Sequence, residues 1–169
     1  MYDMKKIDCT HNMFRQMAAL YQEVWDRNDN DILDRFYRHS NYEGYRGYIV
    51  INDIQQIIGF TYGYTSLPGQ YYRGLLEKEL NEEDTNTWLD NCFEFVELAV
   101  HPQFRKMGIG TGLATALLEG LPHKTAILTT QVWNDSARSL YKSLGWIEVK
   151  HTFLPDGKTP YVIMGKTLR

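Results

Sequence analysis

The feature that most constrains this chain of 169 residues is an alternation of strand and helix signals in its second half. The pattern predicts a strand over residues 93–100, a helix with one apolar side over 110–121, and a β-branched, apolar strand over 125–132. A strand that leads through a helix into another strand of the same sheet forms a parallel pair. The fold must therefore contain a sheet with a parallel pair and a helix packed on it.

The rest of the chain adds helices and antiparallel strands around this unit. The predicted elements are helices over 12–25, 31–38 and 134–144 and strands over 48–51, 56–64, 146–153 and 161–167. The pattern and the length predict an α/β fold in a single domain over residues 1–169. Its core is one mixed, mostly antiparallel central sheet with helices on both faces.

Composition excludes several classes of protein. The 18 Lys and Arg against 21 Asp and Glu give no basic excess of the kind that nucleic-acid binders show. No apolar stretch approaches the ~18 residues of a membrane span, and the first residues show no signal-peptide pattern. The two cysteines, Cys9 and Cys92, match no metal-ligand spacing. We expect a cytoplasmic protein with no metal, nucleic-acid or membrane partner.

The link between the first strand of the unit and its helix carries a candidate binding site. Residues 100–110 read Val-His-Pro-Gln-Phe-Arg-Lys-Met-Gly-Ile-Gly. Gly108 and Gly110 allow positive φ and a close approach of the backbone to a ligand, and amides at a helix N-terminus favour an anion. Arg105 and Lys106 add positive charge. The segment predicts a pyrophosphate-binding turn.

Other glycine motifs fit this turn poorly. A Rossmann fingerprint needs a third glycine where Leu113 stands, and a P-loop needs Gly-Lys-Ser/Thr, which the chain lacks here. A Gly-x-Gly pair alone is more often a turn with only a packing role. The preceding arginine, in the order Arg-x-x-Gly-x-Gly, favours the anion site.

Two segments resemble the GCN5-related N-acetyltransferase (GNAT) superfamily. Residues 98–110, with Leu-Ala-Val-His-Pro before Arg-x-x-Gly-x-Gly, look like its acetyl-coenzyme A signature. Residues 134–146 resemble the family's Asn-x-x-Ala-x-x-x-Tyr-x-x-x-Gly-Phe segment, with Trp146 in place of the usual Phe. The two segments follow in the family's order and spacing, and the resemblance covers residues 93–146.

The resemblance implies an acetyl-CoA-dependent N-acetyltransferase that moves the acetyl group directly to a primary amine in a ternary complex. In the family, amides of the turn bind the pyrophosphate, and the strand before it, which bulges and splays from its neighbour, pairs with the pantetheine arm. The implied cofactor-binding residues are Leu98, Ala99, Val100, Arg105, Lys106, Met107, Gly108, Ile109, Gly110, Thr111 and Asn134. The acceptor is a small-molecule or peptide amine, and a homodimer is common in this fold.

The resemblance also implies that Tyr141 protonates the departing thiolate. A phenol with a pKa near ~10 can protonate a thiolate whose conjugate acid has a pKa of ~8.5. A purely structural role stays open as the alternative for two of these residues. Asn134 can be only a helix N-cap, and Tyr141 can be only a tyrosine of the core.

A general base is needed because a lysine-like amine has a pKa of about 10.4 and must lose a proton before it attacks. Glu94 and Glu97 both lie on the strand before the turn. In a regular strand they face opposite ways, but a bulge breaks the alternation. In relatives whose base comes from this strand, the base commonly lies an even number of residues before the valine at the strand end, and this favours Glu94. Glu97 is the alternative. Either one can instead be a partner of a structural ion pair.

Residues 65–91 interrupt the periodic pattern and predict an acceptor-side loop or lid. From Glu77 to Glu97 the chain carries eight acids and one base. Such a run is usually a solvated face. The sharper hypothesis is an acidic lid that attracts a cationic amine, with cation–π contacts from Tyr71, Tyr72 and Trp88.

Two other functions are alternatives to an N-acetyltransferase. The first is a catalytically silent acyl-CoA-binding or interaction protein on the same fold, against which Tyr141 and the two strand glutamates argue. The second is a nucleotide-binding module that uses the glycine turn for another phosphate ligand. Measuring which of acetyl-CoA, ATP and NAD stabilises the protein separates the nucleotide-binding module from the acetyltransferase.

Overall fold

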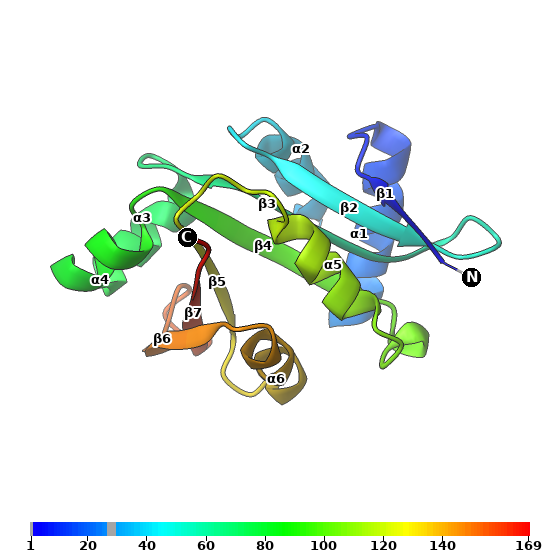
Figure 1. Ribbon diagram of the computed structural model, residues 1–169. Helices are drawn as coiled ribbons and strands as arrows, with labels where there is room; N and C mark the ends of the chain where they lie inside the picture. The colour runs from blue at the N-terminus through cyan, green and yellow to red at the C-terminus, as the bar shows by residue number, and fades with distance from the viewer. Residues whose placement is uncertain (1, 27–29) are drawn as a thin grey trace. The chain divides into compact units, whose positions relative to one another are not determined.

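The elements of the fold are seen in a computed structural model that describes residues 2–26 and 30–169 (Figure 1). The helices are α1 (His11–Trp25), α2 (Ile32–Ser40), α3 (Tyr71–Glu79), α4 (Glu82–Trp88), α5 (Ile109–Leu118) and α6 (Asp135–Ser143), with a short 3-10 helix over Pro102–Phe104. The strands are β1 (Asp3–Lys6), β2 (Arg46–Ile51), β3 (Ile57–Ser66), β4 (Cys92–Val100), β5 (Thr125–Gln131), β6 (Ile147–Phe153) and β7 (Tyr161–Thr167). Within the described residues, none of the helices is long and apolar enough to cross a membrane.

The strands form one sheet in the order β1-β2-β3-β4-β5-β7-β6. The predicted parallel pair is present, because Cys92 to Glu94 of β4 lie in parallel register with Thr125 to Ile127 of β5. The hairpin of β2 and β3 is antiparallel, as are the pairs β1–β2, β5–β7 and β6–β7. The predicted fold class, a mixed and mostly antiparallel sheet with helices, is confirmed.

The sequence pattern missed three elements. Strand β1 is short and its residues are exposed, so it carries no alternation to detect. The segment over residues 65–91, predicted as a loop, contains α3 and α4. Helix α4 begins at Asn81, whose side chain accepts a hydrogen bond from the amide of Asp84. A lid role for this segment stays a prediction, but its conformation is helical.

The chain divides into two compact units, and β4 contributes residues to both. Unit 1 comprises Met1–Tyr64 and Val96–Gly120, and unit 2 comprises Thr65–Phe95 and Leu121–Arg169. The single domain over residues 1–169 stays a prediction.

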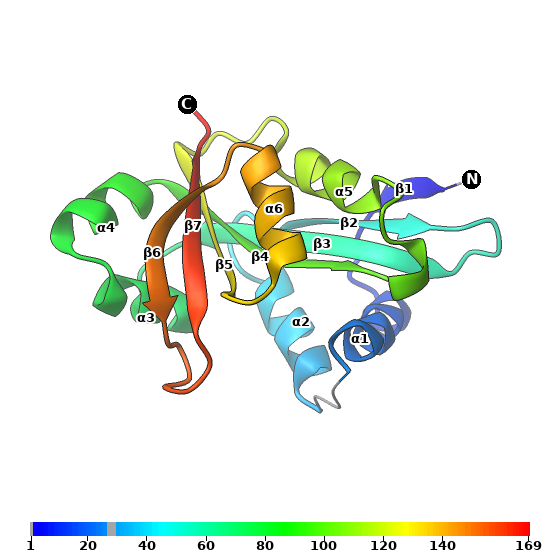
Figure 2. The ribbon, with the colours of Figure 1, turned by 90° about the horizontal axis from the view of Figure 1, so that it is seen from below.

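Unit 1 buries side chains on both faces of its strands. Helix α1 begins at Thr10, whose hydroxyl accepts from the amide of Met13, and its apolar side packs with α2 on one face. On the other face, Ile109 and Leu113 of α5 pack on Val50 and Ile58. Figure 2 shows α5 on one side of these strands and α1 and α2 on the other. The end of β4 and the start of α5 are thus anchored in apolar contacts.

Unit 2 is built on β5, β7 and β6, which lie side by side (Figure 2). Its core joins α3 and α4 to the sheet through the buried residues Leu76, Leu80, Trp88, Leu89, Cys92, Ile127, Phe153 and Ile163. Trp88 of α4 lies directly against the backbone of Gly165 on β7. A Cβ added at Gly165 would be 2.5 Å from the Trp88 ring.

We predict that Gly165→Ala destabilises the protein by about 1–3 kcal/mol, because the added methyl overpacks the contact with Trp88. The matched control is Gly74→Ala on α3, where an added Cβ meets nothing within 4 Å. Alanine favours a helix over glycine by about 0.5–1 kcal/mol, so this variant should be more stable. Urea unfolding followed by circular dichroism measures both, and equal effects of the two changes would contradict the packing argument.

Candidate functional site

The glycine turn places uncapped amides at the start of α5. Gly108 is the N-cap residue with a φ of 82°, and no side chain makes a capping hydrogen bond there. The first amides of a helix have no partner inside the helix, so they are available to an anion. Gly110 lies inside the first turn of α5, so its predicted positive φ is wrong. Lys106, with a φ of 63°, takes the left-handed conformation instead.

The surroundings of this turn suit a large anion. Arg105, Lys106, Met107 and Gly108 are all exposed. A Cβ added at Gly108 would meet no atom within 4 Å, so open space lies in front of the helix start. The two cations, the helix dipole and the free amides therefore fit a pyrophosphate group.

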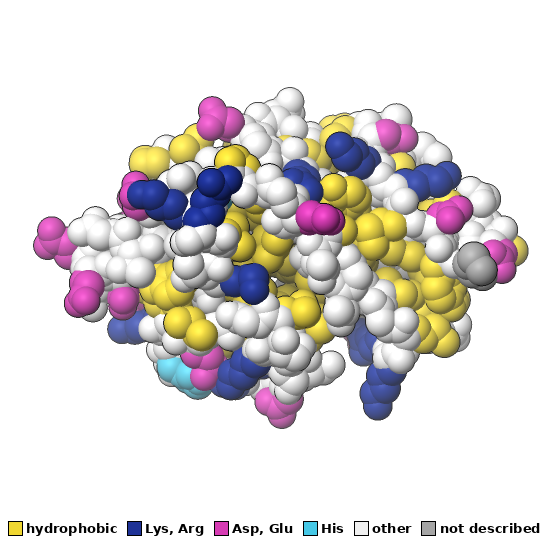
Figure 3. Space-filling model, viewed as in Figure 1, with side chains coloured by type: hydrophobic (Ala, Val, Ile, Leu, Met, Phe, Trp, Pro, Cys, Tyr) yellow, Lys and Arg dark blue, Asp and Glu magenta, His cyan; other side chains and the backbone are white. Residues whose placement is uncertain are grey.

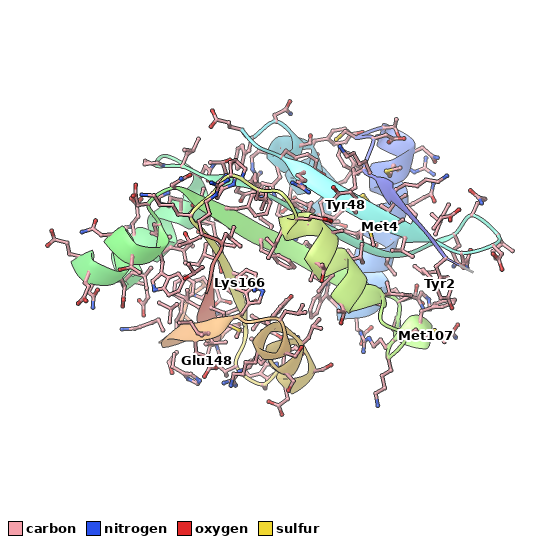
Figure 4. All side chains as sticks on the ribbon, in the orientation of Figure 1. Tyr2, Met4, Tyr48, Met107, Glu148 and Lys166 are labelled. Atoms are coloured by element: carbon pink, nitrogen blue, oxygen red, sulfur yellow. The ribbon has the colours of Figure 1, made fainter. Side chains whose placement is uncertain are left out.

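The turn is braced by Tyr2, the residue just before the strand β1 that the sequence pattern missed. The hydroxyl of Tyr2, just before β1, donates to the Met107 sulfur at 3.3 Å, and its ring meets the Phe104 ring edge-on at 5.9 Å. Figure 4 labels Tyr2, Met4, Tyr48 and Met107 in this part of unit 1, and Figure 3 shows hydrophobic side chains on the surface there. Tyr2 and Met4 gave no periodic signal because β1 is only four residues long.

The second half of β4 breaks the alternation of a regular strand. Leu98 and Val100 pack with the α5 cluster, as alternation requires. Val96 packs against the cluster of α1 and α2, and its neighbour Glu97 reaches Arg35 on α2. Two consecutive side chains therefore contact the same helical layer, so Val96 departs from the alternation that Glu97 and Ala99 keep. A regular alternation therefore does not describe the whole of β4, and the choice between Glu94 and Glu97 as the base stays a prediction.

Glu97 is held in an ion pair. Its Oε2 lies 3.5 Å from Nη2 of Arg35, and its backbone carbonyl accepts from the Thr61 hydroxyl at 2.7 Å. The Arg35 guanidinium also lies over the Tyr21 ring at 5.3 Å. Burial lowers the pKa of Arg35, but the charge of Glu97 and the interactions with Tyr21 and Tyr62 together outweigh it, so that the pKa is raised. Nothing in the sequence signalled Arg35, which is 62 residues from Glu97.

Glu94 occupies a different environment in unit 2. It is 5% exposed and lies on the part of β4 that pairs with β5, opposite Ile127. Burial and then the charge of Glu94 raise the pKa of the Cys92 thiol to about 12, and Arg73 opposes them. Glu94 is thus a buried acid near Cys92, whereas Glu97 is half-buried.

His101, at the end of β4, has structural partners. Its Nε2 lies 3.1 Å from Oε1 of Glu23, and its Nδ1 accepts from the amide of Gln103 at 3.1 Å. The ring also contacts that of Phe104. These contacts give His101 a structural role at the start of the turn.

Helix α6 carries the second predicted set of residues. Asn134 is its N-cap, and Oδ1 of Asn134 accepts from the amide of Ala137 at 3.2 Å. Tyr141 is 7% exposed, and its ring packs edge-on against Phe95 at 5.6 Å and tilted against Trp146 at 5.9 Å. Asn134 is thus a helix cap, and Tyr141 is a tyrosine of the core. Their roles toward acetyl-CoA stay predictions.

Both ends of α6 are fixed to the strands of unit 2. At its C-terminus, Nζ of Lys166 on β7 donates to the Leu144 carbonyl at 2.5 Å. Arg138 pairs with Glu148 of β6 and also donates to the Val132 carbonyl. Burial opposes ionisation of Glu148, but the Arg138 hydrogen bond and the charges of Arg138, Lys142 and His151 together outweigh it and lower its pKa. Figure 4 labels Glu148 and Lys166. Tyr141 therefore stands on a helix with fixed ends.

Several acids before β4 have structural roles. Glu77 lies 3.7 Å from Nε of Arg73, and Asp90 lies 3.5 Å from Nζ of Lys124. Three more occupy the first turn of α4, where carboxylates stabilise a helix: Glu82, Glu83 and Asp84. Part of the acidic run is thus explained without a ligand.

The three aromatic residues proposed for cation–π contacts differ in exposure. Trp88 is 8% exposed and packs inside unit 2, so its predicted contact with an acceptor is wrong. Tyr72 is half-buried, and its hydroxyl is hydrogen-bonded to that of Thr129 at 2.7 Å. Tyr71 is 77% exposed and is the one of the three that is open to solvent.

Comparison with known proteins shows the family of the chain. The model of the Acetyltransferase (GNAT) family matches residues 11–146. A stretch of 74 residues is 35% identical to an N-alpha-acetyltransferase of Sulfurisphaera tokodaii, and it spans 40% of this chain and 44% of that protein.

Solved structures share the fold at low identity. The ribosomal-protein-S18-alanine N-acetyltransferase from Escherichia coli has a TM-score of 0.73 at 16% identity, over 99% of this chain and 94% of that one. Arabidopsis thaliana NAA60 in complex with acetyl-CoA has a TM-score of 0.73 at 15% identity, over 99% of both chains. At these identities the likeness shows the fold.

The cap of α6 yields a stability prediction. Asn134→Ala should lower the free energy of unfolding by about 1 kcal/mol, whereas Asn134→Asp, which keeps a capping oxygen, should lose much less. Ser139→Ala, an exposed change on the same helix, is the control and should stay within about 0.5 kcal/mol. Urea unfolding measures all three. If Asn134→Ala matched the control, the hydrogen bond to Ala137 would contribute nothing.

Proposed function

Because the chain belongs to the GNAT acetyltransferase family, we propose that it transfers an acetyl group from acetyl-CoA to a primary amine. The observation that carries the proposal is the uncapped start of α5, with Gly108 in the left-handed conformation and Arg105 and Lys106 exposed beside it. This turn lies inside the matched region, and its charge suits the pyrophosphate of coenzyme A.

The residues proposed to hold acetyl-CoA fall in three groups. Backbone amides of residues 105–111 bind the pyrophosphate, and the backbone of residues 98–100 pairs with the pantetheine arm. Asn134 adds a hydrogen bond to the pantetheine, a role that competes with its hydrogen bond to Ala137. The bound acetyl-CoA supplies an activated acetyl thioester.

The proposed chemistry needs one proton acceptor and one proton donor from the chain. The neutral acceptor nitrogen bonds to the acetyl carbon, and the carbon–sulfur bond breaks. A glutamate of β4, Glu94 or Glu97, takes the proton that the nitrogen loses, and Tyr141 gives a proton to the departing sulfur. The glutamate's proton returns to Tyr141 through solvent. The net products are the amide and the free thiol.

The proposed acceptor is a cationic amine, free or on a peptide. The name of the curated relative, an N-alpha-acetyltransferase, supports an α-amine. The net charge of −3 and the acids before β4 favour approach of a cation, although several of these acids have partners of their own. A cytoplasmic location and a homodimer stay predictions from the sequence.

An acceptor screen tests this function. The purified protein is mixed with acetyl-CoA and a panel of short peptides, polyamines and acidic or neutral amines, and thiol release is followed. We expect release with cationic amines or peptide α-amines. Acetyl-CoA binding without release over the whole panel would favour the silent acyl-CoA-binding alternative. Stabilisation by ATP or NAD alone would favour a nucleotide-binding module. Acetylation of neutral or acidic amines alone would overturn the cationic acceptor.

Tyr141→Phe tests the proton donor. The variant keeps the ring that packs on Phe95 and Trp146 and removes only the hydroxyl. We expect kcat to fall by about 10²–10⁴-fold, as for the loss of a general acid, with the affinity for acetyl-CoA nearly intact. Tyr37→Phe on α2, which also removes one phenol hydroxyl, is the control. Unchanged turnover in Tyr141→Phe would remove Tyr141 from the mechanism.

A further inference from the structure

The pairing of Arg35 with Glu97 distinguishes one of the two β4 glutamates from the other. Arg35 comes from α2 and places Nη2 3.5 Å from the Glu97 carboxylate. The side chain of Arg35 is 30% exposed and that of Glu97 is 14% exposed, so solvent reaches both. Glu94 is buried by comparison. An acid that exchanges protons with an acceptor and solvent must be reachable, and this favours Glu97.

Several contacts fix the two partners in this geometry. The Arg35 guanidinium lies over the Tyr21 ring of α1, which limits its rotation. The backbone of Glu97 is tied to β3 by the Thr61 hydroxyl. Glu97 lies on the same face of β4 as Ala99, which packs in the cluster of α1 and α2, so its carboxylate is directed toward Arg35. The pair is therefore a fixed feature of unit 1.

From this geometry we propose that Arg35 is a positioning residue, which keeps the Glu97 carboxylate ionised and oriented to take the proton of the acceptor nitrogen. The inference rests on the proposed function and deepens it by choosing Glu97 over Glu94. A cation close to a carboxylate favours its charged form, and only the charged form can accept a proton. Loss of Arg35 should therefore impair the reaction most at low pH.

Two titratable groups near the Arg35–Glu97 pair, Tyr62 and His39, are neutral in the native protein between about pH 5 and 9. Burial, and then the charge of Glu97, raise the pKa of Tyr62 on β3 well above its usual value. Burial, followed by the charges of Arg35 and Arg38, lowers the pKa of His39 on α2 to about 3. The Tyr62 hydroxyl and Nδ1 of His39 are 2.8 Å apart, and both groups stay neutral in this range. Loss of Arg35 also removes one cause of the low pKa of His39, so a pH effect is assigned to Glu97 by the comparison in the Glu97→Gln background below.

The kinetic test compares Arg35→Gln with the native protein, using one acceptor from the screen. The ratio of variant to native kcat/KM is measured from pH 5 to 8.5, and the acceptor's own ionisation cancels in this ratio. We expect the ratio to fall by at least about threefold as the pH is lowered, because Glu97 becomes easier to protonate. Arg38→Gln, which removes an exposed cation from the same helix, should give a flat ratio near one.

Two further variants separate positioning from simple packing. Arg35→Lys keeps a cation and should give a ratio that does not change with pH. In the Glu97→Gln background, Arg35→Gln should cause no further pH-dependent loss, because the carboxylate that it serves is gone. A flat ratio for Arg35→Gln, or an Arg35→Lys ratio as pH-dependent as that of Arg35→Gln, would overturn the proposal.

A spectroscopic titration gives a readout that needs no turnover. The side-chain carboxyl carbon of Glu97 is followed by NMR in the native protein and in Arg35→Gln. We expect its titration midpoint to rise by about one pH unit or more, as for the loss of an opposite charge within 4–6 Å. An unmoved midpoint would overturn the inference, even in an active enzyme. Absence of acetylation by the native protein would instead overturn the proposed function, and the midpoint would still report on the ion pair.

Discussion

The short parallel ladder between β4 and β5 is the constraint on which the candidate site depends. Its register covers Cys92 to Glu94 against Thr125 to Ile127. A parallel pair requires a crossover, and here the crossover contains the glycine turn and α5. The connection between β4 and β5 therefore places the uncapped N-terminus of α5 shortly after β4. Residues 96–100 of β4 lie in unit 1, where Val96 departs from the regular alternation.

The elements that were predicted correctly are those whose signals are local. Helix α6 has its cap at Asn134 and a glycine with positive φ at Gly145, and its observed bounds lie within one residue of the predicted ones. The parallel pair followed from the order of elements alone. By contrast, α3 and α4 carry few apolar residues at helical spacing, and part of their stabilisation comes from contacts such as that of Trp88 with Gly165. Contacts between distant residues override weak local propensity, so the pattern indicated a loop.

The site residues divide in the same way. Gly108, Arg105 and Asn134 could be found because the chemistry of a helix terminus is encoded within a few neighbouring residues. The different surroundings of Glu94 and Glu97 could not be found, because they depend on tertiary contacts such as that of Glu97 with Arg35. Arg35 is the extreme case: a single arginine on an amphipathic helix has no local feature that distinguishes it from Arg38, one turn later. Its role arises only from where α2 packs.

The Arg35–Glu97 pair also changes how the acids of this chain are understood. Counting charges between Glu77 and Glu97 treats all eight acids as one attractive surface for a cation. In the structure, three lie at the start of α4, and Glu77, Asp90 and Glu97 each have a basic partner. A paired carboxylate contributes little to a long-range field, because its partner cancels most of it. What Glu97 can contribute is a fixed, ionised oxygen pair at one place on β4, and that local property matters more for proton transfer than the net charge of the segment.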